Sequence, residues 1–166
     1  PVAIHTRSWK RLYSLARDGD SFGTFLRLTA KYQHTMIVVE TTKGDLLGGF
    51  ADTKWIRGSL SKAGHFFGTG QSFLFSIHDD DEQQQKRVKV HKWTGRNECY
   101  QYCAGQAGYL GMGGGGTTGS FGLFLYDGFA KGSSGPCETF GNDKPLAKQE
   151  YFDIYNMEVY GFVQPY

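Results

Sequence analysis

Apolar residues near the start of the chain recur at the spacing of one helical face. A first set has Ser8 as a capping residue before it and Gly19 as a stop after it, and consists of Trp9, Leu12, Tyr13 and Ala16. A second set follows Asp20 or Ser21, either of which can cap a helix, and consists of Phe22, Phe25, Leu26 and Thr29. The pattern therefore predicts two N-terminal helices.

From Thr35 onward the period changes to that of strands. A continuous apolar run at 36–39 predicts a buried strand, and a turn at 43–45 leads to its hairpin partner at 46–51. A loop is expected at 54–70 and a polar insertion at 79–86. Alternating or apolar residues predict further strands at 73–77, 88–93, 99–103, 109–112, 121–126 and 151–163.

Two helices followed by many short strands indicate an α+β fold. We expect two antiparallel β-sheets packed as a sandwich, with the N-terminal helices flanking it. The composition agrees, because 16% of the 166 residues are aromatic and 24 are glycine, as in an aromatic-cored β protein with tight turns. Residues 1–166 should form a single, monomeric domain, and the start at Pro1 suggests a fragment of a longer protein.

Six residues in the middle of the chain, 111–116, satisfy the letters G-x-G-x-x-G of dinucleotide sites. Strand-like residues follow them and end at Asp127-Gly128, a hairpin signal, so no helix N-terminus is predicted to receive a phosphate. We therefore expect no nucleotide or other cofactor. The glycines are interpreted as architectural, for close approach or positive φ, at Gly111, Gly113, Gly114, Gly115 and Gly116.

Charge and cysteine content narrow the function classes. A net charge of +2 gives no reason to expect nucleic acid, and the chain has neither a long apolar run for direct membrane insertion nor a signal peptide. The odd set of Cys99, Cys103 and Cys137 argues against a disulfide framework and for a reducing, cytoplasmic compartment.

No catalytic or metal motif emerges. G-x-S-x-G, H-E-x-x-H and the Gly-Lys pair of a P-loop are absent, and the five histidines are dispersed. The acidic run 79–82 is interpreted as a solvated loop, with a calcium or basic-partner site as the alternative. Cys99 and Cys103, four apart on a predicted strand, lie too far apart to share one zinc ion, and we interpret them as buried. Cys137, in a loop, is expected to be the more exposed thiol and is the candidate redox-sensitive residue, although no nearby basic residue would activate it.

Several stretches together resemble one known family, the TLDc domains of the oxidation-resistance proteins. They are, in order, GTGQSFLF at 68–75, KWTG at 92–95, the glycine run before 121–123, CETFGN at 137–142, FDI at 152–154 and EVYGF at 158–162. The ordered set covers almost the whole chain, from about Trp9 to Phe162, and is more specific than any one stretch. The sequence departs from the family at Gln71, where the family usually has Glu, and the insertion at 79–86 is longer than expected.

The resemblance implies a function by binding. It implies a non-catalytic module in resistance to oxidative stress that binds the peripheral sector of the vacuolar-type proton ATPase and regulates that enzyme. The domain would then be cytoplasmic, with recruitment to endolysosomal or vacuolar membranes through its partner. The alternative from another class is a thiol antioxidant, reducing or scavenging peroxide with Cys137. A third interpretation is an intramolecular scaffold for other domains.

Two residues stand out as candidate partner contacts. Trp93 and Arg96 flank the predicted turn at 94–95, and tryptophan and arginine are enriched at interface hot spots. The alternative is that Trp93 belongs to the core and Arg96 is merely solvated.

Overall fold

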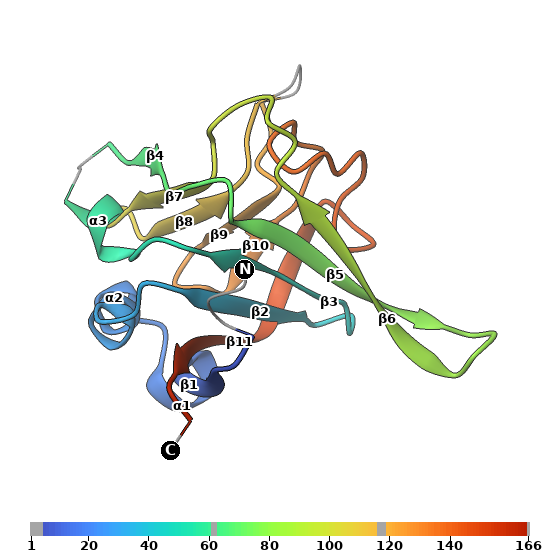
Figure 1. Cartoon of the computed structure of the whole chain (residues 1–166), viewed down its shortest axis with the longest axis horizontal. Coiled ribbons are helices and arrows are strands. Elements are labelled where there is room, and N and C mark those ends of the chain that lie inside the picture. The colour runs from blue at the N-terminus through green and yellow to red at the C-terminus, as the bar shows by residue number, and fades with distance from the viewer. Residues whose placement is uncertain (1–4, 61–62, 116–118, 166) are drawn as a thin grey trace.

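The computed structural model of the protein describes residues 5–60, 63–115 and 119–165. The chain is mostly β (Figure 1). Its elements are β1 Ser8–Ser14, α1 Leu15–Asp18, α2 Phe22–Thr29, β2 Thr35–Thr41, β3 Leu46–Ala51, α3 Ile56–Ser59, β4 His65–Phe67, β5 Phe73–Asp80, β6 Gln85–Lys92, β7 Gln101–Ala104, β8 Tyr109–Met112, β9 Leu123–Tyr126, β10 Lys131–Ser133 and β11 Tyr151–Val163. No described helix is long and apolar enough to cross a membrane.

The strands form one antiparallel sheet rather than the two separate sheets expected. Its order is β4-β7-β8-β9-β10-β11-β2-β3-β5-β6, with β1 added to β11. The joint is β11, whose 13 residues pair with β10 at 151–153, with β2 at 154–161 and with β1 at 158–163. We call β1, β2, β3, β5 and β6 the β2 half, and β4, β7, β8, β9 and β10 the β8 half. Because β11 pairs with strands of both halves, the two halves are continuous through it and do not form two separate sheets.

The two halves share one hydrophobic core. Ile37, Leu47 and Leu74 of the β2 half belong to the same buried cluster as Leu110 and Met112 of the β8 half. The approach is close: a Cβ atom added at Gly49 of β3 would come 2.5 Å from the sulfur of Met112. A second cluster consists of Met36, Phe50 and Phe75 of the β2 half together with Phe162 of β11, and contains no residue of the β8 half.

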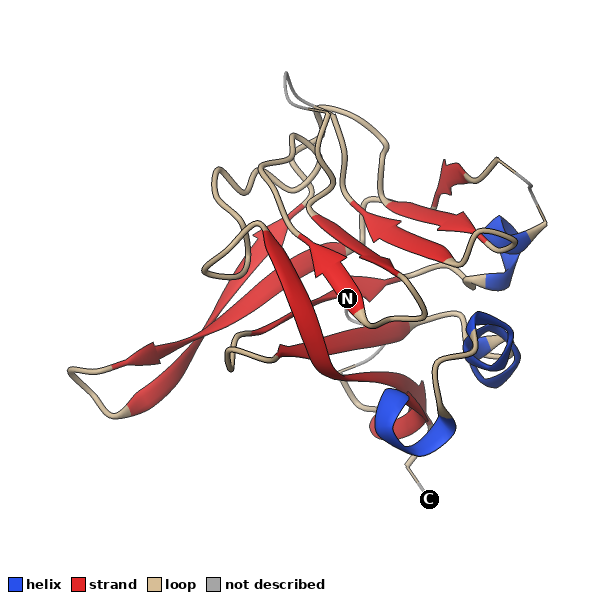
Figure 2. Ribbon diagram, turned by 180° about the vertical axis from the view of Figure 1, so that it is seen from behind, coloured by secondary structure: helices blue, strands red, loops and turns tan. Residues whose placement is uncertain are grey.

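The second predicted helix is confirmed, and it closes one end of the core. Ser21 caps α2 by accepting a hydrogen bond from the main-chain N–H of Thr24 at 3.3 Å. Phe25 is fully buried, and its ring packs against Tyr13, Trp55 and Phe129. Figure 2 shows all three helices grouped on one side of the molecule.

The first predicted helix is wrong. Residues 8–14 form β1, and only the single turn of α1 is helical. The segment pairs with β11 from Ser8 to Ser14, and a bulge between Arg11 and Tyr13 lets the adjacent Leu12 and Tyr13 both be buried. Trp9 is largely exposed and packs edge-on against Tyr160 and Phe162 of β11. Main-chain pairing with a neighbouring strand therefore outweighed a local helical spacing.

Two loop predictions and two strand predictions also need correction. The loop expected at 54–70 contains α3 and β4. The polar insertion expected at 79–86 is the end of a long hairpin, in which β5 runs to Asp80 and β6 begins at Gln85. The short β10 was not predicted, and β7 begins at Gln101, after Cys99. These elements are short or polar, so the tertiary pairing that creates them left no hydrophobic period in the sequence.

Candidate functional site

Trp93 lies directly after β6 and is anchored rather than loose. Its ring packs edge-on against Tyr100, with centroids 5.4 Å apart, and covers Gly70, where any Cβ atom would collide with the ring. The indole N–H donates to the main-chain oxygen of Asn97 at 2.7 Å. With 40% of the residue still exposed, Trp93 is neither a core residue nor a freely moving one.

Arg96 is exposed beside Trp93, on a turn that is tied to a distant loop. Its main-chain N–H donates to the hydroxyl of Thr94. The Thr94 hydroxyl in turn donates to the main-chain oxygen of Glu138 at 2.6 Å, and the Thr94 N–H to that of Thr139 at 2.9 Å. The Trp93–Arg96 turn is therefore held in place from 44 residues away in the sequence.

Thr139 is the centre of this arrangement. It is fully buried, its hydroxyl donates to Asn97 Oδ1 at 2.6 Å, and it accepts from the N–H of Gly114 at 2.9 Å. We call residues 93–99, 113–115 and 137–142 the Trp93 loop cluster. Because its three segments are cross-linked by hydrogen bonds, several of them buried or partly buried, the cluster presents Trp93 and Arg96 on a fixed framework.

The glycine run packs closely against the other two segments of the Trp93 loop cluster. Gly113 and Gly115 have φ of +78°, which side chains rarely adopt. A Cβ atom would come 2.8 Å from Phe121 at Gly111, 2.8 Å from the sulfur of Cys137 at Gly113 and 3.2 Å from Cys99 at Gly114. At Gly115 it would strike the amide of Asn97. Gly116, the fifth glycine predicted to be architectural, lies outside the described residues, and the element that follows the run is strand β9.

Cys137 is buried, which corrects the expectation of an exposed thiol. Only 5% of the residue is exposed, and its S–H donates to Asn142 Oδ1 at 2.9 Å. Burial raises the pKa of the Cys137 thiol, although main-chain N–H groups from Phe140, Thr139 and Gly141 oppose part of that rise. The loop composition suggested exposure, whereas the close approach of Gly113 and Gly122 seals the sulfur inside.

The other two cysteines differ from each other. Cys103 lies on β7, is fully buried as expected, and has its thiol pKa raised to about 12 by that burial. Cys99, which was also expected to be buried on the strand, instead precedes the strand and is partly exposed; burial of part of the residue raises the pKa of its thiol as well. Within the described residues, no three His, Cys, Asp or Glu side chains gather as a metal site would require.

A buried carboxylate, Asp52, was missed by the sequence analysis. It is 5% exposed and accepts hydrogen bonds from the Thr69 N–H at 3.1 Å, from the Thr69 hydroxyl and from the Ser72 hydroxyl at 3.2 Å. These hydrogen bonds hold the GTGQ turn at 68–71, one of the stretches that resemble TLDc domains, against the end of β3. Gln71 is exposed in that turn, next to Gly70 beneath Trp93, so the departure from Glu changes the surface rather than the core. An aspartate directly after a buried strand was the only signal for this network.

Comparison with known proteins gives a match over nearly the entire chain. Residues 1–163 match the family model described as the TLDc domain. The chain is 30% identical to human nuclear receptor coactivator 7 over 98% of its length, which is 16% of that protein. It is 32% identical to human oxidation resistance protein 1 over 93% of its length, again 16% of that protein.

Zebrafish MTOR-associated protein MEAK7 is similar as well, with 32% identity over 95% of the chain and 33% of the relative. The chain thus spans only a sixth to a third of the length of these relatives. The match begins before β1 and ends at the last residue of β11, so it includes every element described above. The chain belongs to the TLDc domain family.

Proposed function

We propose that this domain is a non-catalytic binding module that acts in resistance to oxidative stress. The observation that carries the proposal is the TLDc match over residues 1–163, which the chain shares with proteins named for oxidation resistance. We further propose, from what TLDc resemblance implies, that the partner is the peripheral, ATP-hydrolysing sector of the vacuolar-type proton ATPase and that binding regulates this enzyme. The domain would act as a monomer in the cytoplasm and reach vacuolar or endolysosomal membranes through that partner.

The Trp93 loop cluster supports a binding function. An interface residue contributes most when its side chain is held in place before binding, because less conformational entropy is then lost. Trp93 meets this condition through Tyr100 and the hydrogen bond to Asn97, and it still exposes 40% of its surface. Arg96 adds an exposed cation beside it. We therefore propose Trp93 and Arg96 as partner contacts.

The thiol-antioxidant alternative receives less support. A thiolate is the reactive form of cysteine, and reactive cysteines combine a low pKa with access to solvent. Cys137 has a raised pKa, is buried and donates its S–H to Asn142. Comparing peroxide turnover by the wild type with that by Cys137→Ser tests this alternative directly; turnover that is lost in the variant would favour it over the binding module.

The test of the proposed function is capture of the purified peripheral sector by the immobilised, folded domain, with ATP hydrolysis measured alongside. We expect binding at micromolar concentrations and a change in ATPase activity. Trp93→Ala and Arg96→Glu should each weaken binding at least about tenfold, as for hot-spot residues. Arg27→Glu makes the same charge change at an exposed position of α2 and serves as the matched control.

Two different results would contradict the proposed partner and the proposed contact surface. No capture at micromolar concentrations by a domain shown to be folded would contradict the proposed partner. Full binding by folded Arg96→Glu and Trp93→Ala variants would leave the partner but remove the Trp93 loop cluster as its contact.

A further inference from the structure

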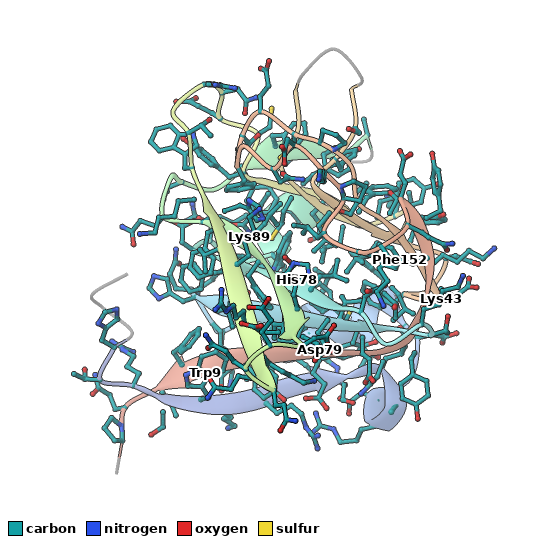
Figure 3. The ribbon with its side chains drawn as sticks, turned by 90° about the vertical axis from the view of Figure 1, so that its right-hand side faces the viewer. Trp9, Lys43, His78, Asp79, Lys89 and Phe152 are labelled. Atoms are coloured by element: carbon teal, nitrogen blue, oxygen red, sulfur yellow. The ribbon has the colours of Figure 1, made fainter. Side chains whose placement is uncertain are left out.

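Strand β6 is a long, open edge of the sheet. It stands last in the strand order and pairs only with β5. Every residue of β6 is exposed except His91, which is half-buried. Within the described part of the chain, none of its main-chain groups takes part in a hydrogen bond outside the ladder with β5. In Figure 1 the β5–β6 hairpin extends beyond the body of the molecule, and in Figure 3 β6 runs across the front of the view.

Such an edge carries a row of unpaired N–H and C=O groups that can accept a further strand. The eight residues Gln85–Lys92 give an edge of roughly 26 Å at about 3.3 Å per residue, longer than a typical strand of a globular protein. Proteins protect edges of this length with a covering element, a bulge, a proline or charged side chains, above all lysine. The register between β5 and β6 is unbroken from Phe73–Lys92 to Asp80–Gln85 and β6 contains no proline, so its protection consists of its cations, which repel a basic strand but not an acidic one.

The two faces of β6 have different chemistry. Val88 and Val90 share a face with Ile77 and Phe75, their partners on β5, and extend the apolar surface of the Phe50–Phe75 cluster to the edge. They remain 60% and 45% exposed. Lys86 and Lys92 flank the two valines on the same face, and the opposite face carries Arg87 and Lys89. An added strand would therefore meet two central valines between lysines on one face and two cations on the other.

The positive charge along the edge is only partly neutralised. Arg87 forms an ion pair with Asp80 at 2.6 Å, and Lys86 lies opposite Asp79. Lys89 and Lys92, in contrast, lie opposite Ser76 and Phe73, so the cross-strand partner of neither is acidic. Figure 3 shows Lys89 further along the hairpin than Asp79, which lies close to the turn. The excess of positive charge is thus at the end of β6 that enters the body of the domain.

We propose that the open edge of β6 is a docking site for an extended acidic segment of a partner protein, which adds to the sheet as a further strand. The segment would alternate apolar and acidic residues, with apolar residues over Val88 and Val90 and acidic residues beside Lys89. A second copy of this chain fits poorly. In an antiparallel β6–β6 pair centred on Val88, Lys89 faces Arg87, and in one centred on Lys89 it faces itself, and like charges directly opposite are unfavourable.

The test uses a fluorescently labelled octapeptide that alternates Val and Glu, with a Val–Lys octapeptide as its matched control. Binding to the folded domain is followed by fluorescence anisotropy. We expect the Val–Glu peptide to bind at least about tenfold more tightly than the Val–Lys peptide, with weaker binding as salt is raised. Lys89→Glu should abolish this preference, because the new carboxylate offsets Lys92, whereas Lys31→Glu, at an exposed position after α2, should leave it unchanged.

Two further measurements separate strand addition from simple charge attraction. Peptides N-methylated at alternate residues lose the N–H groups of one edge, so only one of the two methylated sets should bind at least about tenfold more weakly. The unmodified peptide should also slow hydrogen exchange at alternate amides of 85–92. Equal binding of both methylated sets, no preference for Val–Glu over Val–Lys, or unchanged exchange at saturation would each overturn the proposal. So would pairing of two domains through β6, detected as a dimer in sedimentation whose formation itself slows hydrogen exchange at 85–92.

Discussion

Replacing Gly113 by alanine tests whether the glycine run is shaped by backbone conformation, by close packing, or by both. Gly113 has φ of +78°, and a Cβ atom there would come 2.8 Å from the sulfur of Cys137 and 3.0 Å from Phe140. The chain offers a matched control in Gly95, which has φ of +79° and nothing within 4 Å of the added atom. The two substitutions therefore share the conformational cost and differ in the collision.

The expected losses in the free energy of unfolding follow from the conformational cost and the packing collision. A left-handed conformation costs a non-glycine residue about 1–2 kcal/mol, which is the whole expected effect of Gly95→Ala. Overpacking a buried site adds about 1–3 kcal/mol, so Gly113→Ala should lower the free energy of unfolding by about 2–5 kcal/mol. Typical domains have about 5–15 kcal/mol in total, so this loss is a large fraction of the stability.

Urea denaturation of the wild type and both variants, followed by tryptophan fluorescence, measures the difference. Removing the sulfur in Gly113→Ala/Cys137→Ala should cost less than the sum of the single substitutions, because the added methyl group gains room. A difference below about 0.5 kcal/mol between Gly113→Ala and Gly95→Ala would refute the packing argument, since it is within the additivity error of independent sites. A negligible effect of both would refute the conformational one.

Three other predictions concern the core and the thiols. Phe25→Ala and Phe75→Ala should each cost about 3–5 kcal/mol in chemical denaturation, and a loss under about 1 kcal/mol at both would mean that the core is wrongly identified. In the folded domain, Cys137 should react with iodoacetamide far more slowly than the partly exposed Cys99, by mass spectrometry of the modified peptides, and similar rates would contradict its burial. The Cys103 thiol, with its pKa raised from 9.0 to about 12, favours the folded state only while protonated, so stability should fall as pH rises across that interval. Cys103→Ala should show a shallower fall in denaturation at increasing pH, and an identical pH profile would count against this contribution.

Local pattern was a good guide wherever an element is long and apolar. The strands at β2 and β3 and the 13-residue β11 were predicted because their apolar runs are bounded by turns and polar loops. The cap at Ser21 has a local cause, and it was predicted as one of two candidates. The TLDc resemblance, later confirmed by the family match, rested on an ordered set of such short local stretches.

Pattern failed where residues distant in the chain decide the outcome. Residues 8–14 have a helical spacing, yet the free side of β11, about 150 positions later, makes them a strand. Cys137 has the neighbours of an exposed loop residue, yet Gly113 and Gly122 bring main chain against its sulfur. The Asp52 network joins residues 17 and 20 positions apart through side-chain hydrogen bonds, and such bonds produce no periodic pattern of apolar residues in the sequence. Trp93 and Arg96 lie beside the turn where the sequence put them, but the anchoring of that turn through Thr139 depends on the same kind of distant contact.

The pairing of β1 with β11 determines how the domain would respond to force. Ser8 lies opposite Val163, so the first residue of β1 and the last residue of β11 leave the sheet side by side. Tension between these two residues would act along the hydrogen bonds, which run perpendicular to the strands, and would load them in succession rather than together. The domain would therefore peel open from this corner at low force, releasing β1 until Leu12 and Tyr13 must leave the core.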